Sequence, residues 1–322
     1  LRTGAFPIGI DAQDFAELSQ SATARRTHDV MAAHTAFRKM VIGVDRLDYS
    51  KGVEERFLGF ERLLAAHPEL RREVLFLQIA PISREGVEAY REIRARLDAL
   101  SGRINGEYAD IDWNPVRYVN RNYRRDELAG IYRAAKVALV TPLRDGMNLV
   151  AKEFVAAQDP TDPGVLVLSR FAGAANQLKS ALIVNPNSPE EIAEALHRAL
   201  SMDLMERIER WRALFDNVQR EDVTAWRDAF VRALAATREA DRVRTAEGPF
   251  YGEQARPLSV HAGLQSDGRT ERPGEGQTGG APALRDPEAR RDPAALRLPT
   301  GTGRGLQVLG GDQGPLPRPP RT

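Results

Sequence analysis

The sequence contains no cysteine and no long apolar run, and its charges nearly cancel. Without cysteine the chain has neither disulfide bonds nor thiolate metal ligands, which fits a reducing compartment, and we expect a cytoplasmic protein. No apolar stretch approaches the roughly 18 residues of a membrane helix, so we predict no membrane association. A formal net charge of +1 gives no general attraction to nucleic acid, which we do not expect as a partner.

Histidine is also scarce, with five in a chain of 322 residues. These histidines are scattered without the spacing of a zinc site. Asp110 and Asp112, near Asn114, lack the turn glycine and the further oxygen ligands of a calcium loop. We therefore predict no metal site and no cofactor.

The end of the chain lacks whole classes of residue. After Tyr251 there is no aromatic residue and no Lys, Ile, Asn or Met, while Gly, Pro, Arg, Ala and Asp dominate. Such a segment buries too little apolar surface to offset the entropy of ordering, so we predict a disordered low-complexity tail over residues 245–322. A frame-shifted translation would have the same bias toward GC-rich codons, and a functional disordered tail is the alternative.

Over the rest of the chain, short apolar runs alternate with helical patterns. Runs typical of buried parallel strands cover residues 40–44, 74–79, 116–119, 137–140, 165–168 and 182–184. Helical spacing predicts helices over 53–64, 84–100, 126–135, 147–157 and 221–234, with two more from about 189 and 203. This order predicts an α/β fold with a doubly wound parallel sheet, which binds ligands at the carboxyl ends of its strands.

The first charged phrase runs from Asp45 to Gly52, directly after a predicted strand. Its guanidinium at Arg46 and ammonium at Lys51 both suit a diphosphate. Gly52, where a helix begins, would let a phosphate approach the backbone. The alternative is a solvated loop with surface cations.

The second phrase runs from Thr141 to Glu153, where a strand ends, a glycine-containing turn follows and a helix begins. The first amides of that helix are free to donate to a ligand. Asp145 and Glu153 are about two helical turns apart and would accept hydrogen bonds from sugar or ribose hydroxyls. The alternative is an Asp that complements the helix dipole and a surface Glu.

A third cation, Arg84, follows the strand predicted over 74–79. At that edge of the sheet it would hold a second anion, although a lone loop arginine is also typical of a surface. Ser83 beside it is not a predicted nucleophile, because no His/Asp partner pattern accompanies it.

Four stretches, residues 44–52, 102–106, 144–153 and 171–175, resemble trehalose-phosphate synthases of glycosyltransferase family 20, and the likeness extends over roughly 5–234. The resemblance implies the C-terminal, Rossmann-like domain of a glycosyltransferase B fold. It also implies a retaining transfer of glucose from UDP-glucose to glucose 6-phosphate, without a metal, giving α,α-trehalose 6-phosphate in trehalose biosynthesis.

The resemblance assigns the donor diphosphate to Arg46 and Lys51, which we take as the catalytic residues. It assigns the transferred glucose to Asp145, and the sugar and phosphate to the backbone of the loop that follows. The positions implied in substrate binding are Arg84, Tyr123, Leu128, Asp145, Gly146, Met147, Asn148, Leu149, Val150 and Glu153.

The remaining roles concern the nucleoside and the acceptor. Glu153 corresponds to the ribose ligand, and Tyr123, through its backbone, and Leu128 to the uracil environment. The family often has phenylalanine in place of Tyr123. Arg84 corresponds to an arginine on the acceptor phosphate.

In the family another Rossmann-like domain precedes this half and carries most acceptor contacts. Residues 1–40 would then be its remnant with an interdomain segment, 41–218 the nucleotide-sugar-binding domain, and 219–244 a helix crossing back. The chain begins with Leu1, and we expect a piece that is inactive alone. The alternatives are a catalytically silent sugar-nucleotide-binding fragment and a glucosylglycerol-phosphate synthase.

The predicted crossing helix has one apolar face, formed by Val223, Trp226, Phe230 and Leu234. If the preceding domain is absent, part of this face lacks a packing surface. We therefore expect self-association, and a homo-oligomer is the predicted protein partner.

Overall fold

The structure is a computed structural model that describes residues 3–35, 38–81 and 88–246, without the side chains of 88–90 and 238–246. These residues belong to one compact unit. The predicted tail lies outside the described residues from position 247 onward, as does Arg84.

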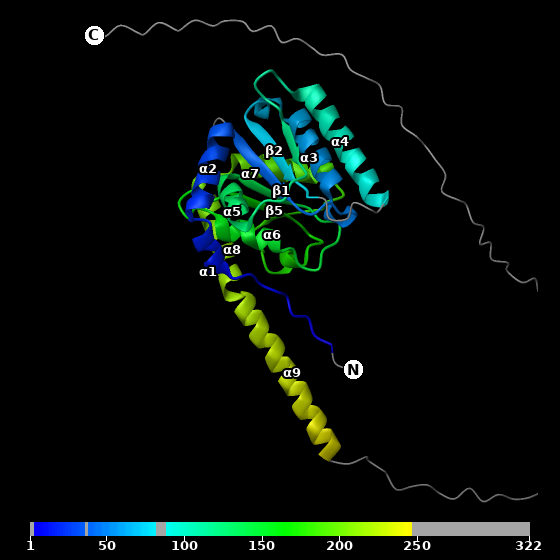
Figure 1. Cartoon of the computed structure of the whole chain (residues 1–322), viewed down its shortest axis with the longest axis vertical. Helices are drawn as coiled ribbons and strands as arrows, with labels where there is room; N and C mark the ends of the chain where they lie inside the picture. The colour runs from blue at the N-terminus through cyan, green and yellow to red at the C-terminus, as the bar shows by residue number, and fades with distance from the viewer. Residues whose placement is uncertain (1–2, 36–37, 82–87, 247–322) are drawn as a thin grey trace, which may run out of the picture. The chain divides into compact units, whose positions relative to one another are not determined.

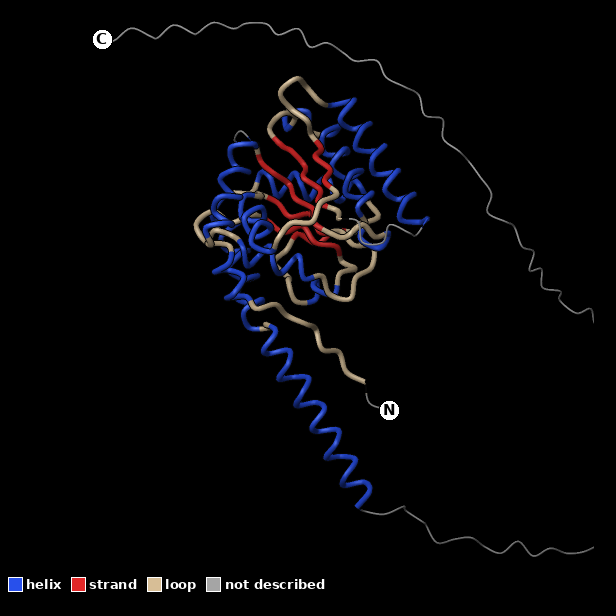
Figure 2. Tube along the Cα trace, in the orientation of Figure 1, coloured by secondary structure: helices blue, strands red, loops and turns tan. Residues whose placement is uncertain are grey.

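Six parallel strands form a single sheet among the described residues (Figure 2). They are β1 (Lys39–Val44), β2 (Val74–Ile79), β3 (Val116–Val119), β4 (Val137–Val140), β5 (Val165–Ser169) and β6 (Leu182–Val184). Their order in the sheet is β3-β2-β1-β4-β5-β6. Strands β2 and β4 are buried along their whole length because helices cover both faces of the sheet. The predicted parallel α/β sheet is confirmed.

The helices fall between and after these strands. They are α1 (Ala12–Leu18), α2 (Ala22–Thr35), α3 (Val53–Ala66), α4 (Glu88–Tyr108), α5 (Arg125–Ala134), α6 (Leu149–Ala157), α7 (Pro189–Ser201), α8 (Leu204–Arg220) and α9 (Val223–Ala246). None of the helices in the described part of the chain is long and apolar enough to cross a membrane.

Helices lie on both sides of the sheet (Figure 1), and the sheet separates two hydrophobic cores. On one face, α3, α4 and α7 pack around Phe57 and Phe60, whose rings each lie 5.4 Å from that of Phe76. On the other face lie α1, α2, α5, α6 and α8, with Phe15 and Ala24 fully buried. Residues 12–35 therefore pack on the same core as the sheet, and the domain boundary at residue 40 stays a prediction.

Helix α4 ends later than the sequence predicts, at Tyr108 instead of about residue 100. Its last turns contain Gly102 and Gly106, which weaken a helix in isolation. Contacts with the rest of the fold hold them: Ile104 is fully buried. The Asn105 amide donates to the Val116 carbonyl over 2.9 Å and accepts from its N–H over 3.0 Å. Tertiary packing thus outweighs the local preference of the two glycines.

The order of the strands determines where a ligand can bind. From β1 the chain moves outward to β2 and β3, and it then returns to place β4 on the other side of β1. The loops after β1 and β4 therefore follow neighbouring strands at the carboxyl edge of the sheet, at the point where the strand order reverses, which is where such sheets bind ligands. The first charged phrase predicted from the sequence lies in the loop after β1, and the second begins in the loop after β4 and continues into α6.

Candidate functional site

The loop after β1 is held in shape by its own side chains. Leu47 is fully buried. The Asp48 carboxylate accepts from the Ser50 N–H over 2.9 Å and from its hydroxyl over 2.7 Å. This leaves Arg46 exposed, and the Lys51 side chain retains 17% exposure. The two predicted cations thus lie on an ordered loop at the carboxyl end of β1.

Gly52 ends this loop in the left-handed region, with φ at 61°. A Cβ at this position would lie 2.0 Å from the Thr141 carbonyl oxygen. Only glycine fits both the backbone conformation and this close approach of the two loops.

The loop after β4 is tied directly to the first loop. The Ser50 carbonyl accepts from the amides of Leu143 and Arg144 over 2.8 and 3.4 Å. The Lys51 ammonium donates to the Asp145 carboxylate over 2.7 Å. The fold therefore brings together two predicted site residues from the two phrases, and each is more than four-fifths buried.

Asp145 is further held by the start of helix α6. Its carboxylate accepts from the Asn148 side-chain amide over 3.2 Å and from the Met147 N–H over 3.4 Å. Asn148 has φ at 87° and caps α6 by accepting from the Ala151 amide over 3.0 Å. The amides of Leu149 and Val150, the first two residues of α6, have no acceptor within the helix and remain available to an anion.

The stretch from Phe171 to Ala174, after β5, is hydrogen-bonded to the loop after β4 through backbone groups. The Asp145 N–H donates to the Phe171 carbonyl over 3.2 Å, and the Gly173 N–H donates back to the Asp145 carbonyl over 3.0 Å. Beyond it, the Ala174 N–H donates to the Met147 carbonyl over 2.8 Å. A Cβ at Gly173 would lie 2.0 Å from the Gly146 carbonyl oxygen. Gly146 itself is exposed, and a Cβ there would meet nothing within 4 Å.

A residue that sequence reasoning missed, Arg56, lies beneath both loops and is fully buried. Its guanidinium donates to the Asp45 carboxylate over 2.5 Å and to the Lys51 carbonyl over 3.0 Å. It also donates to the Thr141 hydroxyl over 2.9 Å. One side chain thereby fixes the end of β1, the Lys51 backbone and the end of β4.

The spacing of apolar residues in α3 could have identified Arg56 as a buried residue. Arg56 follows Val53 by three positions and precedes Phe60 by four, so it lies on the face of α3 that is buried against the sheet. A charge on that face needs a buried partner, and Asp45 supplies it. Burial raises the pKa of the Asp45 carboxyl, while the adjacent Arg56 guanidinium acts in the opposite direction.

Glu153 lies one helical turn beyond the start of α6 and is partly buried. Burial raises its pKa, and the Arg125 charge opposes this rise. Its neighbour Tyr132 is fully buried, and burial together with the charges of Glu153 and Asp45 raises the Tyr132 pKa well above its ordinary value. Glu153 thus lies next to α5, where it neighbours Tyr132 and the Arg125 charge.

Tyr123 and Leu128 are partly buried against the same core, before and within α5. The Arg121 guanidinium lies 5.3 Å above the Tyr123 ring. Among the described residues, no hydrogen bond or ion pair joins Tyr123, Leu128 or Glu153 to Lys51 or Asp145. The site therefore has two parts, a tightly bonded pair of loops and a separate group around α5.

Comparisons with known proteins agree with this architecture. A model of glycosyltransferase family 20 matches residues 1–236. A trehalose-6-phosphate synthase of Sinorhizobium fredii is 50% identical over 234 residues, which cover 73% of this chain and 50% of that protein. One from Escherichia coli is 46% identical over 251 residues, or 76% of this chain and 53% of the relative. The chain thus spans about half the length of the curated relatives it matches.

Solved structures give the same result. A UDP-forming α,α-trehalose-phosphate synthase from Burkholderia xenovorans, in complex with glucose-6-phosphate, is 51% identical, with a TM-score of 0.71 over 73% of this chain and 52% of that one. The Burkholderia multivorans enzyme is 44% identical, with a TM-score of 0.73 over 80% of this chain and 53% of its own. The extent of the family match, together with these relatives, shows that the chain belongs to glycosyltransferase family 20.

Proposed function

We propose that this chain is the donor-binding half of a retaining glucosyltransferase that moves glucose from UDP-glucose to glucose 6-phosphate, giving α,α-trehalose 6-phosphate. The observation that carries the proposal is the junction of the two loops, where the Lys51 ammonium and the Asp145 carboxylate meet 2.7 Å apart beside the free amides of α6. Cations and amides suit a diphosphate, and a carboxylate suits sugar hydroxyls. A 47% identical structure from E. coli, described as bound with UDP-2-fluoro glucose, supports this assignment.

In this proposal Arg46, Lys51 and the amides at the start of α6 bind the diphosphate, while Asp145 binds the glucose. A bound diphosphate would compete with Asp145 for the Lys51 ammonium, so Lys51 would contact both parts of the donor. Glu153 would accept from the ribose, and Tyr123 and Leu128 would border the uracil. Asp45 and Arg56 are positioning residues that hold Lys51 from below.

The proposed reaction takes place on one face of the sugar. The bond from the anomeric carbon to the diphosphate oxygen breaks, and the acceptor hydroxyl forms a new bond to that carbon from the same face. The acceptor proton moves to the departing phosphate oxygen, so UDP leaves protonated and the charges balance. Arg46, Lys51 and the α6 amides would stabilise the negative charge that develops on the phosphate, each worth about 10²–10³ in rate by analogy with oxyanion-hole donors.

A second candidate function is donor binding without transfer. It is favoured because the chain spans about half the length of its relatives, and because the resemblance assigns most acceptor contacts to a domain preceding this half. Arg84, the residue proposed for the acceptor phosphate, lies outside the described residues. Loss of acceptor orientation removes several kcal/mol of catalysis, so the chain alone would bind UDP and transfer no glucose.

Calorimetric titration of the full chain with UDP tests the donor site. We expect binding in the wild type and about 10–100-fold weaker binding in Lys51→Ala, because one hydrogen-bonded charge contributes about 1.5–3 kcal/mol. The matched control is Lys136→Ala, which removes a lysine paired with Asp162 just before β4, at the opposite edge of the sheet. Equal UDP affinity in wild type and Lys51→Ala, or no UDP binding at all, would refute the proposed donor site.

A coupled assay of UDP release from UDP-glucose with glucose 6-phosphate distinguishes the two functions. Binding without turnover supports the donor-binding fragment, and turnover by the same chain supports the complete transferase. The N-terminal half of a relative can also be added as a separate chain. Restored turnover would show that this half supplies the acceptor contacts.

A further inference from the structure

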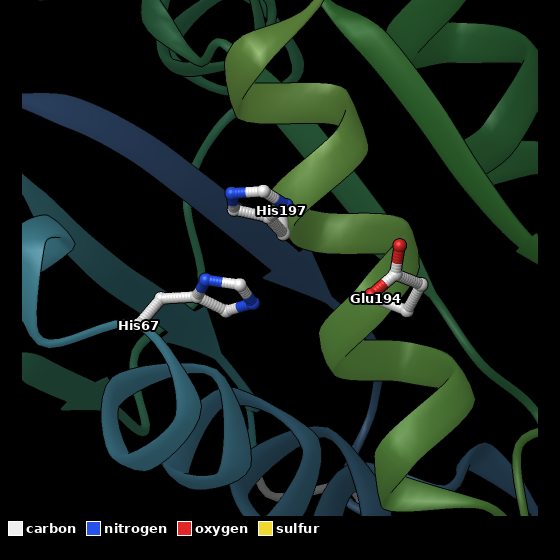
Figure 3. A group of neighbouring side chains, drawn as sticks. All are labelled: His67, Glu194 and His197. Atoms are coloured by element: carbon white, nitrogen blue, oxygen red, sulfur yellow. The ribbon is translucent and has the colours of Figure 1, made fainter.

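A group of three potential metal ligands lies on the surface between α3 and α7, away from the proposed donor site. Their ligand atoms, one each from His67, Glu194 and His197, all lie within 4.8 Å of one another. Figure 3 shows the two imidazole rings and the carboxylate gathered where the end of α3 meets α7. Neighbouring Leu200 accepts a hydrogen bond from Lys39 at the start of β1, which places the group toward the amino edge of the sheet, opposite the two loops.

The two helices hold the backbone of these three residues in fixed positions. Glu194 and His197 are three residues apart on α7 and therefore share one face of that helix. His67 follows the last residue of α3, and its N–H donates to the Leu63 carbonyl over 2.9 Å. The helices approach closely because Gly59 has no side chain, and a Cβ there would lie 2.3 Å from Ile192. The ligands are thus carried by two firmly packed elements.

A neighbouring carboxylate prepares His67 for metal binding. The His67 Nδ1 atom lies 3.1 Å from a Glu69 carboxylate oxygen, so Nδ1–H donates and the lone pair resides on Nε2. Metal-ligating histidines commonly have such a carboxylate on their other nitrogen, which fixes the tautomer and raises the basicity of the ligating atom.

The rings of His67 and His197 stack with centroids 3.8 Å apart and planes 6° from parallel. An imidazole lone pair lies in the plane of its ring, so one ion cannot lie in both planes as the rings stand. One ring must turn about its χ2 bond, a broad torsion of low cost. Because the His197 side chain is only partly buried, it has room to make that turn.

We propose that His67, Glu194 and His197 form a binding site for a divalent transition-metal ion of the zinc class, which would join the end of α3 to α7. Two imidazoles and one carboxylate are the donor set of several zinc sites, and the exposed Glu194 leaves a fourth position open to water. Mg²⁺ and Ca²⁺ prefer six or more oxygen ligands, which this group does not offer. Spacing along the chain could not predict the site, because the fold alone brings His67 to His197.

Calorimetry with Zn²⁺ on the full chain, free of a histidine tag and dialysed against chelator, tests this site. We expect one high-affinity site in the wild type, weakened at least 100-fold in His197→Gln and about 10-fold in Glu69→Gln. Glu194→Gln keeps the size of the side chain and should also weaken binding. Mg²⁺ should produce no saturable heat.

His28→Ala is the matched control. His28 pairs through Nδ1 with Asp29 over the same 3.1 Å as His67 with Glu69, but it belongs to no group of three ligands among the described residues. Zn²⁺ should raise the melting temperature of the wild type and of His28→Ala, and leave that of His197→Gln unchanged. Equal zinc affinity in wild type and His197→Gln, or an equal loss in His28→Ala, would overturn the proposal.

Discussion

Two glycines of this chain have opposite surroundings, and the same substitution should affect them in opposite directions. Gly52 has positive φ, and a Cβ would lie 2.0 Å from Thr141. Gly52→Ala should therefore lower the free energy of unfolding by about 1–3 kcal/mol or more. Gly106 is exposed within α4, and a Cβ there would meet no atom within 4 Å. Gly106→Ala should therefore raise the free energy of unfolding by about 0.5–1 kcal/mol. Urea denaturation of both variants measures the contrast, and stabilisation by Gly52→Ala would refute the close approach of the two loops.

Arg56 allows a second test at the scale of single residues. Arg56→Met leaves the buried Asp45 without its partner and should lower the free energy of unfolding by about 3–5 kcal/mol. Asp45→Asn combined with Arg56→Met removes both charges and should recover much of that loss. Urea denaturation of the single and double variants measures this difference. Equal destabilisation of the two variants would show that the unpaired Asp45 charge is not the cause of the loss.

At the scale of elements, the strands could be predicted well because each is a short apolar run between turn residues. β2 occupies the predicted residues 74–79, and β1 begins one residue earlier than predicted. The end of α4 could not be predicted, because the bonds from Asn105 to Val116 depend on tertiary structure. Lys51 and Asp145 could be predicted as site residues because each follows the end of a predicted strand. Their pairing could not be predicted, because it depends on β4 lying beside β1 in the sheet, which no local sequence pattern encodes.

Helix α6 offers a test by pH, because burial raises the pKa of Glu153 above its ordinary value of 4.5. Ionising this carboxyl costs more in the folded state than in the unfolded chain. Its contribution to stability is therefore fully present below the unfolded pKa and is lost as pH rises through the folded pKa. Glu153→Gln should be more stable than the wild type at pH 8, and the difference should shrink toward pH 4.

Thermal melts across this range measure the effect, with Glu209→Gln on the exposed side of α8 as the control. A stability difference for Glu153→Gln that does not vary with pH would contradict this account. Because Glu153 is also the proposed ribose ligand, the same variant should bind UDP more weakly. A gain in stability with a loss of affinity would be typical of a binding residue held in an unfavourable environment.

At the scale of the whole molecule, the start of α9 packs on the segment that precedes α1. The Val223 N–H donates to the Ile10 carbonyl and the Trp226 indole to the Phe6 carbonyl, both over 3.1 Å. The rings of Phe6 and Phe230 meet edge to face, 5.3 Å apart. The predicted apolar face of this helix is therefore covered at its beginning, by residues of the chain itself.

Farther along α9 the cover ends. Phe230 and Leu234 remain 44% and 49% exposed, and together with Phe6 they line an open hollow. A contiguous exposed apolar surface promotes association. We expect the wild type to sediment as a concentration-dependent oligomer, and Phe230→Ser with Leu234→Ser to shift it toward the monomer. Val30→Ser removes an exposed apolar side chain from a different helix, α2, and serves as the control. Analytical ultracentrifugation distinguishes the cases: a monomeric wild type, or dissociation by Val30→Ser to the same degree, would show that this face does not drive association.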